Sequence, residues 1–182
     1  GGPGGILVCG MDAEITNNTI DACTGFGIGT LEVYHPTLTP PAMTYTINIK
    51  NNIITNTKTH SLAGGKGYGI YNKNLGLSGV THAYNLNNNC IFNSTTAATY
   101  GTVSQSNTTT GNPLFKDSTN STLKNRDYHL QSNGSRWNGS GWTTDGSSSP
   151  CINAGDSNST KEPPDISAVV NLGRYGDTLE AS

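Results

Sequence analysis

Side chains suited to acid–base chemistry gather between residues 32 and 82. Histidine, lysine and tyrosine can abstract a proton next to a carboxylate, and a nearby positive charge can stabilise the enediolate that results. This is the chemistry of polysaccharide lyases. Taken singly, each such residue also fits an ordinary position in a solvated loop. The candidate catalytic residues are His60, Lys66, Lys73, His82 and Glu32, and the candidate substrate-binding residues beside them are Tyr34, His35 and Tyr71.

Hydrolysis of a glycosidic bond requires two carboxyl groups instead, ~5–5.5 Å apart for retention of configuration or ~6.5–9.5 Å apart for inversion. Asp12, Glu14 and Asp21 form the densest acidic group of the chain. Glu14 aligns with Asn48 and Asn85 in the repeats described below, which favours an ordinary position at a turn or strand edge. The sequence therefore leaves lyase and hydrolase chemistry both open.

Two tryptophans and a late acidic group complete the candidates. Trp137 and Trp142 can stack on a sugar and bind substrate, or they can cover the open end of the fold and protect its edge strands. Asp156, Glu162 and Asp165 can coordinate calcium together with backbone carbonyls. The chain has no EF-hand and no glycine-rich calcium repeat. We therefore assign no metal ligands, and calcium is the one cofactor that needs a test.

Three repeated segments predict the elements that position these residues. Each has an apolar residue, two or three asparagines and a second apolar residue, at intervals of 34 and 37 positions. Short apolar segments without helical periodicity indicate strands, and a repeat of this length indicates stacked units. We predict an all-β fold, a right-handed parallel β-helix in which each repeat is one coil. The aligned segments are Glu14–Cys23 (EITNNTIDAC), Asn48–Thr57 (NIKNNIITNT) and Asn85–Ser94 (NLNNNCIFNS).

Stacking of coils explains the asparagines. Asparagine side chains in a column can bond to one another and to turn amides, and asparagine tolerates a left-handed backbone. An all-β sandwich with coincidental asparagine pairs is the alternative. The expected columns are Asn18, Asn52 and Asn89 at a turn; Ile15, Ile49 and Leu86, and Ile20, Ile54 and Ile91, in the core; and Phe26, Tyr68 and Tyr100 beside glycines.

Insertions interrupt these coils. The segments Thr30–Thr46, Lys58–Gly67 and Lys73–His82 do not follow the repeat. Insertions into solenoids often gather on one face, commonly the binding face. We therefore expect most of the candidate residues to flank a groove along the coils.

Composition excludes several function classes. Charged residues make up 12% of the chain, about half of the usual ~25%, and the net charge is -2. Such a balance gives no basis for binding nucleic acid or an anionic membrane surface. No segment approaches the ~20 apolar residues of a membrane span. The chain begins without methionine or a signal peptide, which indicates a piece of a longer protein.

Cysteines and glycosylation motifs bear on the compartment. Cys9, Cys23, Cys90 and Cys151 match no zinc spacing, and they are either two disulfides or buried thiols. Seven Asn-x-Ser/Thr motifs are compatible with an extracellular surface. Localisation outside the cell or at its surface is therefore our expectation.

The amino-acid sequence no longer follows the repeat after its third copy. The succession GNPLFKD, DYHLQSNG, SPCINAGDSN and NLGRYGDTLEAS resembles the closing strands of secreted right-handed parallel β-helix proteins. Ser135–Asp156 (SRWNGSGWTTDGSSSPCINAGD) resembles the disaggregatase family of archaeal cell-surface enzymes, which degrade the matrix polysaccharide that holds cells together. This resemblance implies a pectate-lyase-like fold. Asn153 and Arg174 stand where the family usually shows Asp and Ala, and no catalytic residue is carried over.

Together these features predict one β-helix domain over residues 1–182, with coils over about 1–110 and closing strands with an irregular C-terminal cap over about 111–182. The resemblance implies a lyase or glycoside hydrolase that acts on a cell-surface polysaccharide. The alternative is a non-catalytic carbohydrate-binding, adhesion or structural module. Expected partners are the polysaccharide, the rest of a parent chain or two further copies in a trimer. Charged candidates at one cleft would favour the enzyme, and charged candidates on separate faces would favour the module.

Overall fold

The computed structural model describes residues 4–30, 43–61, 66–73, 80–156 and 169–181. Short strands dominate these residues, and Leu123–Asn125 form a 3-10 helix. The strands up to residue 106 are β1 (Ile6–Val8), β2 (Ala13–Thr16), β3 (Thr19–Asp21), β4 (Phe26–Thr30), β5 (Met43–Lys50), β6 (Ile53–Thr55), β7 (Tyr68–Tyr71), β8 (Val80–Asn87), β9 (Cys90–Phe92), β10 (Ala97–Tyr100) and β11 (Val103–Ser106). The later strands are β12 (Phe115–Asp117), β13 (Asp127–Leu130), β14 (Arg136–Trp137) and β15 (Trp142–Thr143).

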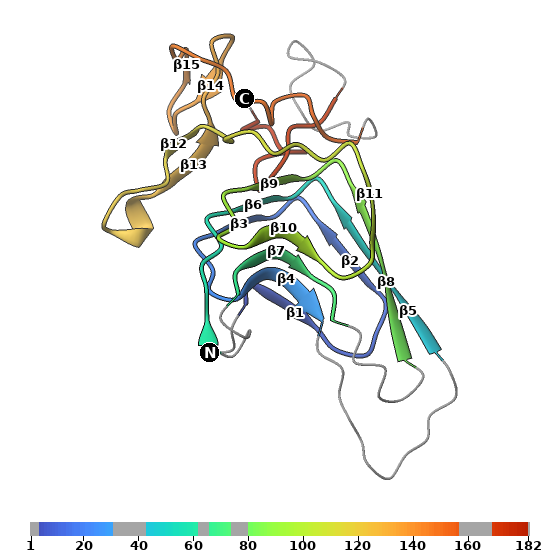
Figure 1. Cartoon of the computed structure of the whole chain (residues 1–182). Coiled ribbons are helices and arrows are strands. Elements are labelled where there is room, and N and C mark those ends of the chain that lie inside the picture. Colours follow the sequence, from blue (N-terminus) through green and yellow to red (C-terminus); the bar gives the residue numbers. More distant parts are fainter. Residues whose placement is uncertain (1–3, 31–42, 62–65, 74–79, 157–168, 182) are drawn as a thin grey trace.

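Three parallel sheets organise the strands from β1 to β11. The first sheet has the order β1-β4-β7-β10, the second β2-β5-β8-β11 and the third β3-β6-β9. Consecutive strands enter the first, second and third sheet in turn, so each strand pairs with its counterpart one circuit later (Figure 1). The described fold is therefore all-β with parallel sheets, consistent with a β-helix-like solenoid. We call each circuit a coil.

The predicted core columns are confirmed by the strand register. Ile15 pairs with Ile49 and Ile49 with Leu86, while Ile20 pairs with Ile54 and Ile54 with Ile91. All of these side chains are buried in one hydrophobic cluster. The coil-on-coil alignment read from the sequence is therefore the alignment in space.

The predicted aromatic column is wrong at its third member. Phe26 pairs with Tyr68, but Tyr68 pairs with Ala97, and Tyr100 pairs with Tyr71. The glycine after Tyr100 explains the shift, because Gly101 has φ +80° at a corner where a Cβ would lie 1.9 Å from the carbonyl oxygen of Asn72. The sequence around Tyr100 resembles the Gly-aromatic-Gly motif of the earlier coils, but Gly101 forms the corner after β10 instead of lying within the strand.

The asparagine column is confirmed, and the two asparagines of each pair have different roles: one forms hydrogen bonds between coils and the other forms the turn. Asn52 Oδ1 accepts hydrogen bonds from the backbone N (2.9 Å) and Nδ2 (3.0 Å) of Asn18. Asn89 Oδ1 accepts the same pair of bonds from Asn52, at 3.0 and 3.1 Å. The preceding residues Asn17, Asn51 and Asn88 carry the left-handed backbone, with φ between 51° and 56°. One column thus bonds inward and its neighbour makes the turn.

The segment after residue 110 packs against the third sheet. We call its described residues, 111–156 and 169–181, the C-terminal layer, and it lies along the outer face of the third sheet (Figure 1). Strand alternation points Ile54 inward and Ile53 and Cys90 outward, where Leu130 and Cys151 cover them. The third sheet is therefore apolar on both faces, and its outer face requires a cover of this kind.

Candidate functional site

A groove lies where the third sheet meets the C-terminal layer. It consists of two adjoining hollows of 480 and 300 Å³ that share Asn56, Ser118 and Thr119. Polar and charged residues line the larger hollow apart from Ala22, and two phenylalanines line the smaller one. The other residues that line the larger hollow are Asp21, Ala22, Lys58, Asn93, Thr95 and Arg126, and those of the smaller hollow are Thr55, Phe92, Asn112, Pro113, Leu114, Phe115 and Gln131.

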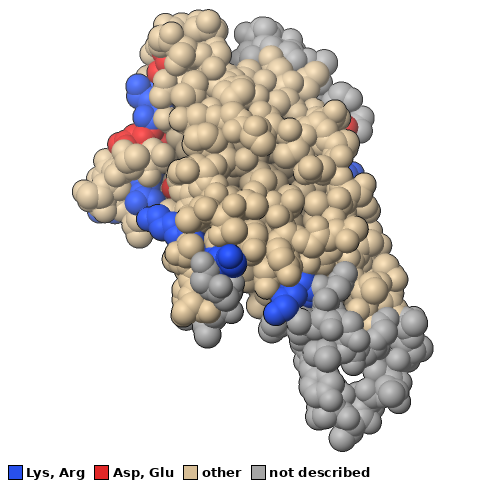
Figure 2. Space-filling model, viewed as in Figure 1, with Lys and Arg blue, Asp and Glu red and all other residues tan. Residues whose placement is uncertain are grey.

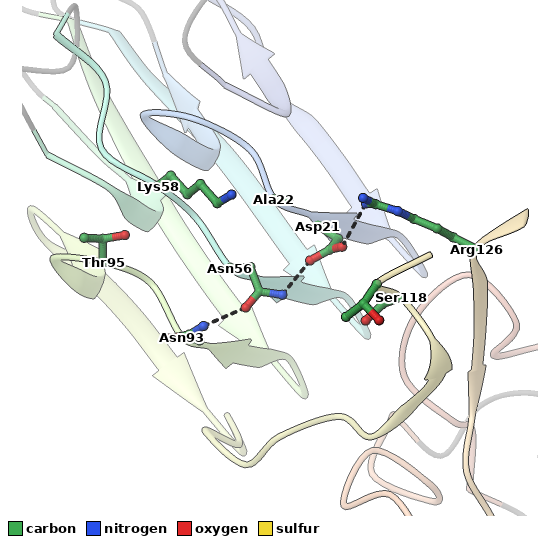
Figure 3. A pocket seen from close by; sticks show the side chains of 9 residues that line it. Asp21, Ala22, Asn56, Lys58, Asn93, Thr95, Ser118 and Arg126 are labelled. Atoms are coloured by element: carbon green, nitrogen blue, oxygen red, sulfur yellow. Dashed lines mark hydrogen bonds and ion pairs between the residues drawn. The ribbon is translucent and has the colours of Figure 1, made fainter. Parts of the chain in front are cut away.

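A second column of amides forms the floor of the larger hollow (Figure 3). Asn93 Nδ2 donates to Asn56 Oδ1 (2.7 Å), and Asn56 Nδ2 donates to Asp21 Oδ1 (2.8 Å). Ala22, Asn56 and Asn93 occupy equivalent corners with φ between 54° and 58°. The repeat itself therefore produces this floor, since equivalent corners of successive coils lie one above the other at the ~4.8 Å spacing of paired strands.

Asp21 is the carboxylate of this floor, and its oxygens are occupied. They accept hydrogen bonds from Thr55 Oγ1 (2.8 Å), Asn56 Nδ2 (2.8 Å) and the Tyr128 hydroxyl (3.0 Å), and Arg126 forms an ion pair at 3.7 Å. The Asp21 side chain is only 5% exposed. Burial raises the pKa of Tyr128, whose protonated hydroxyl is the donor. Asp21 therefore anchors Tyr128 and Arg126 from the C-terminal layer rather than acting as an open acid or base.

Two cations lie on opposite sides of Asn56 in Figure 3. Arg126 forms the 3.7 Å ion pair with Asp21 and donates from Nε to the Asn120 carbonyl oxygen at 3.1 Å. Lys58 is exposed, and its ammonium has no ion-pair partner among the described residues. Its backbone is fixed, because Lys58 N donates to the Cys23 carbonyl oxygen at 2.7 Å. Lys58 therefore presents a positive charge from a fixed position.

The remaining surface in this view carries little charge. Figure 2 shows a mostly uncharged face, with acidic and basic side chains at its left edge over the C-terminal layer and further basic side chains below its middle. In the C-terminal layer Arg136 binds Asp145 at 2.7 Å, and Lys116 approaches Asp145 at 3.4 Å. The hydrogen bond from Arg136 lowers the pKa of Asp145 to about 2. These charges pair with one another, whereas Lys58 faces the groove without a partner of this kind.

The groove suits a polyhydroxylated ligand. Amide and hydroxyl side chains supply both donors and acceptors, and Lys58 supplies a charge for an anionic group. Phe92 and Phe115 add apolar surface in the smaller hollow. Hydrolysis requires two carboxyl groups, but Asp21 is the one carboxylate among the described lining residues. Its oxygens already accept hydrogen bonds from neighbouring side chains.

Two of the predicted site residues are packed among aromatic rings. His82 is 3% exposed and stacks on Tyr45 at 5.8 Å between ring centroids. Tyr71 stacks against Phe26 at 5.7 Å and against Tyr100 at 5.1 Å. Neither His82 nor Tyr71 lines the groove.

The other basic candidates lie apart from them. His60 and Lys66 face each other in an antiparallel bridge, and Lys73 is exposed two residues beyond the end of β7. None of these three lines the groove either. Glu32, Tyr34 and His35 lie outside the described residues, as does most of the first predicted insertion. The second and third insertions are described only at their ends, and all these residues stay predictions.

Trp137 and Trp142 form an edge-to-face pair on the β14–β15 hairpin, with ring centroids 5.6 Å apart. Trp142 is 45% exposed, and neither ring belongs to a core cluster. Both roles considered for the pair, stacking on a sugar and covering the open end of the fold, therefore stay predictions.

Sequence reasoning missed Lys58, Asn56, Asn93 and Arg126 as site residues. The two asparagines had a signal, because both follow the inner asparagine by four positions in their repeats. Arg126 had none, since its place depends on how the C-terminal layer folds back to Asp21 in the first coil. An alignment of the repeats cannot predict a contact between Arg126 and Asp21, because Arg126 lies outside the repeats.

Metal and membrane features are few in the part of the chain that the structure describes. No group of three or more His, Cys, Asp or Glu side chains there is arranged to hold a metal ion. Asp156 is described, with its backbone N bound to Asn51 Oδ1 at 2.9 Å, whereas Glu162 and Asp165 fall outside the described residues. No described helix is long and apolar enough to cross a membrane.

Comparison with known proteins confirms the predicted resemblance. The sequence model of the family described as disaggregatase related matches residues 2–155. No curated protein and no solved structure gives a match. Because the matched region spans most of the chain, this protein belongs to the disaggregatase-related family.

Proposed function

We propose that the chain is a right-handed parallel β-helix that binds the matrix polysaccharide of a cell surface, outside the cell, through the groove beside the third sheet. Two findings support the proposal. The strands rotate through three parallel sheets, as in a solenoid. The family to which the chain belongs is described by its relation to disaggregatase.

The floor of the groove is the observation that carries this function. Asn56 and Asn93 form a column of amides that can donate to and accept from sugar hydroxyls. Lys58 and Arg126 flank this column and can bind the carboxylate of an acidic sugar. Because the column runs across the coils, successive sugar residues would meet successive coils.

Binding is favoured over catalysis by the placement of the basic candidates. His82 is buried in β8, and His60 pairs with Lys66 away from the groove lining. Lys73 likewise does not line the groove. A groove whose lining holds none of these described basic candidates is the pattern expected of a carbohydrate-binding module.

Cleavage by elimination is the second candidate function, and Lys58 is the observation that favours it. An elimination needs a base near the proton and a positive charge near the carboxylate. Lys58 and Arg126 are the two basic side chains of the larger hollow. In this scheme Arg126 holds the substrate carboxylate and Lys58, as the neutral amine, takes the proton.

Binding is tested by isothermal titration of the chain with polygalacturonate and with a neutral glucan. Lys58→Ala is expected to weaken binding of the acidic polymer about tenfold, the equivalent of one charge-assisted contact. Asn93→Ala is expected to weaken binding of both polymers. Lys124→Ala is the matched control, because Lys124 is an exposed lysine of the 3-10 helix outside the groove lining. Equal losses in Lys58→Ala and Lys124→Ala would exclude this groove.

Cleavage is tested separately by following the ultraviolet absorbance of unsaturated sugar products and the release of reducing ends, with calcium and with a chelator. Activity that is lost in Lys58→Ala while binding is retained would support elimination. Reducing ends without absorbance would indicate hydrolysis. If neither signal appears while titration still shows binding, the module function is favoured.

A further inference from the structure

Two cysteines from distant parts of the chain meet beneath the C-terminal layer. Cys90 lies in β9 and faces out of the third sheet, and Cys151 follows the turn at Ser149. Both side chains are completely buried, 61 positions apart in sequence. They share one hydrophobic cluster with Ile53, Leu130 and Leu172. Cys90 belongs to the third coil and Cys151 to the C-terminal layer, so their contact joins the two regions.

The backbone around both thiols is fixed. Cys90 Sγ contacts the Gly111 carbonyl oxygen at 3.4 Å. A Cβ placed on Gly111 would lie 3.0 Å from Pro150 Cγ, so the segment before Cys151 packs directly on this residue. Cys151 N donates to Ser149 Oγ, and Cys151 O accepts from Leu172 N, both at 3.0 Å. The two thiols are thus held together from both sides.

The folded protein protects these thiols from reagents. A hydrogen bond with Cys151 and burial raise the pKa of the Cys90 thiol. The thiolate is the reactive form of cysteine, so the pair is inert once the layer has packed. Chemistry at this pair therefore belongs to folding, before the C-terminal layer closes over β9.

We propose that Cys90 and Cys151, both free thiols in this structure, are a modification site: a disulfide that fastens the C-terminal layer to the third coil when the chain folds in an oxidising compartment. The oxidant is a small disulfide such as oxidised glutathione. One thiolate attacks it and releases one glutathione, giving a mixed disulfide. The second thiolate then displaces the other glutathione, so the chain loses two protons and two electrons and the oxidant gains them.

The remaining two cysteines provide an internal control. Cys9 and Cys23 are only partly buried and belong to the first coil. Burial, followed by the charge of Asp21, raises the pKa of Cys23. Neither Cys9 nor Cys23 belongs to the cluster that holds the proposed pair. Both are therefore expected to remain thiols under the same treatment.

The test is oxidative refolding followed by peptide mapping. The reduced, denatured chain is refolded in a glutathione redox buffer, quenched in acid, alkylated in denaturant and digested without reduction. The expected product is one cross-linked peptide pair that contains Cys90 and Cys151 and lacks two hydrogen atoms, with Cys9 and Cys23 alkylated. Recovery of Cys90 and Cys151 as alkylated thiols, or a cross-link to Cys9 or Cys23 instead, would overturn the proposal.

Thermal unfolding gives an independent measurement on the refolded chain. Closing a loop of this length is expected to raise Tm by about 10 °C over the same protein with reductant. The Cys9→Ser/Cys23→Ser variant should keep this difference, and Cys90→Ser should lose it. If reductant lowers Tm equally in the wild type and in Cys90→Ser, the disulfide is absent.

Discussion

The coils and the C-terminal layer satisfy their polar groups in different ways. In the coils, amides bond to identical amides one circuit away, as Asn52 does with Asn89. In the layer, ion pairs such as Arg136 with Asp145 satisfy the polar groups, and each ion pair that joins two described residues involves the layer. A repeated contact needs only a neighbouring coil, whereas each contact of the layer is made once. A sequence repeat can therefore encode the contacts of the coils, whereas each contact of the layer requires its own pair of residues.

The two regions meet on the outward asparagines. Asn17 Nδ2 donates to the Gly176 carbonyl oxygen (3.5 Å) and Asn88 Nδ2 to that of Ala154 (2.8 Å), while Asn51 Oδ1 accepts from Asp156 N (2.9 Å). Each of the three coils thus offers one amide to the layer. The repeat supplies a regular column, and an irregular segment binds along it.

The largest effect is expected where the coils depend on one another. Asn52 is fully buried, and its side chain bonds to both neighbouring asparagines and to the carbonyl oxygens of Ile15 and Lys50. Asn52→Ala should lower the free energy of unfolding by about 3–5 kcal/mol, because it leaves several buried groups unpaired. Urea unfolding measures this loss.

The matched variant for Asn52 is Asn85→Ala, in the column that faces outward on the second sheet. Asn85 is exposed and donates to Asn48 Oδ1 at 3.0 Å. Exposed substitutions of this kind usually change stability by about 0.5 kcal/mol or less. If Asn85→Ala costs as much as Asn52→Ala, burial of the inner column is not what holds the coils together.

A pH titration tests whether the layer depends on charge. Asp145 has a pKa lowered to about 2, first through its hydrogen bond from Arg136. A carboxyl group with a depressed folded pKa stabilises above its unfolded value and loses that contribution as pH falls through the folded one. The contribution, at most about 2 kcal/mol, should therefore disappear between about pH 4 and pH 2. Asp145→Asn should lack this component of the pH profile, and a wild-type profile identical to that of Asp145→Asn would contradict it.

The joint between the regions can be tested at Asn51. Asn51→Gly keeps the left-handed backbone and removes the bond to Asp156, which should cost about 1 kcal/mol. Asn51→Ala should cost about 1–2 kcal/mol more, because alanine is strained at φ 56°. Urea unfolding measures both, and limited proteolysis shows whether residues 111–181 are released first. Equal losses in the two variants would mean that the turn conformation is not a constraint at this position.

Prediction from sequence succeeded where the molecule repeats. The columns through Ile54 and Asn52 followed from aligned segments, because paired strands place equal positions one above another. It failed at Tyr100, where a sequence similar to the earlier motifs has a different register because Gly101 forms a corner. It gave no account of how the layer packs, since nothing in the repeat shows that Ile53 faces outward and needs a cover. The groove combines a predictable and an unpredictable part. Its floor, Asn56 and Asn93, follows from the repeat, whereas Arg126 on one wall belongs to the layer.

A small effect is expected at Tyr128, whose hydroxyl links Arg126 to Asp21 in the floor. Tyr128→Phe removes one hydrogen bond to Asp21 (3.0 Å) and keeps the edge-to-face contact of the ring with Phe115. The expected loss is about 1 kcal/mol of stability. Since Arg126 Nη1 lies 3.5 Å from the same hydroxyl, the variant should also weaken binding of an acidic polysaccharide while binding of a neutral one is unchanged. Tyr100→Phe, at a tyrosine that is 44% exposed in the coils, is the control. If both variants bind the acidic polymer equally well, Asp21 and the Asn120 carbonyl oxygen hold Arg126 without this hydroxyl, and the contact from the layer to the floor does not require it.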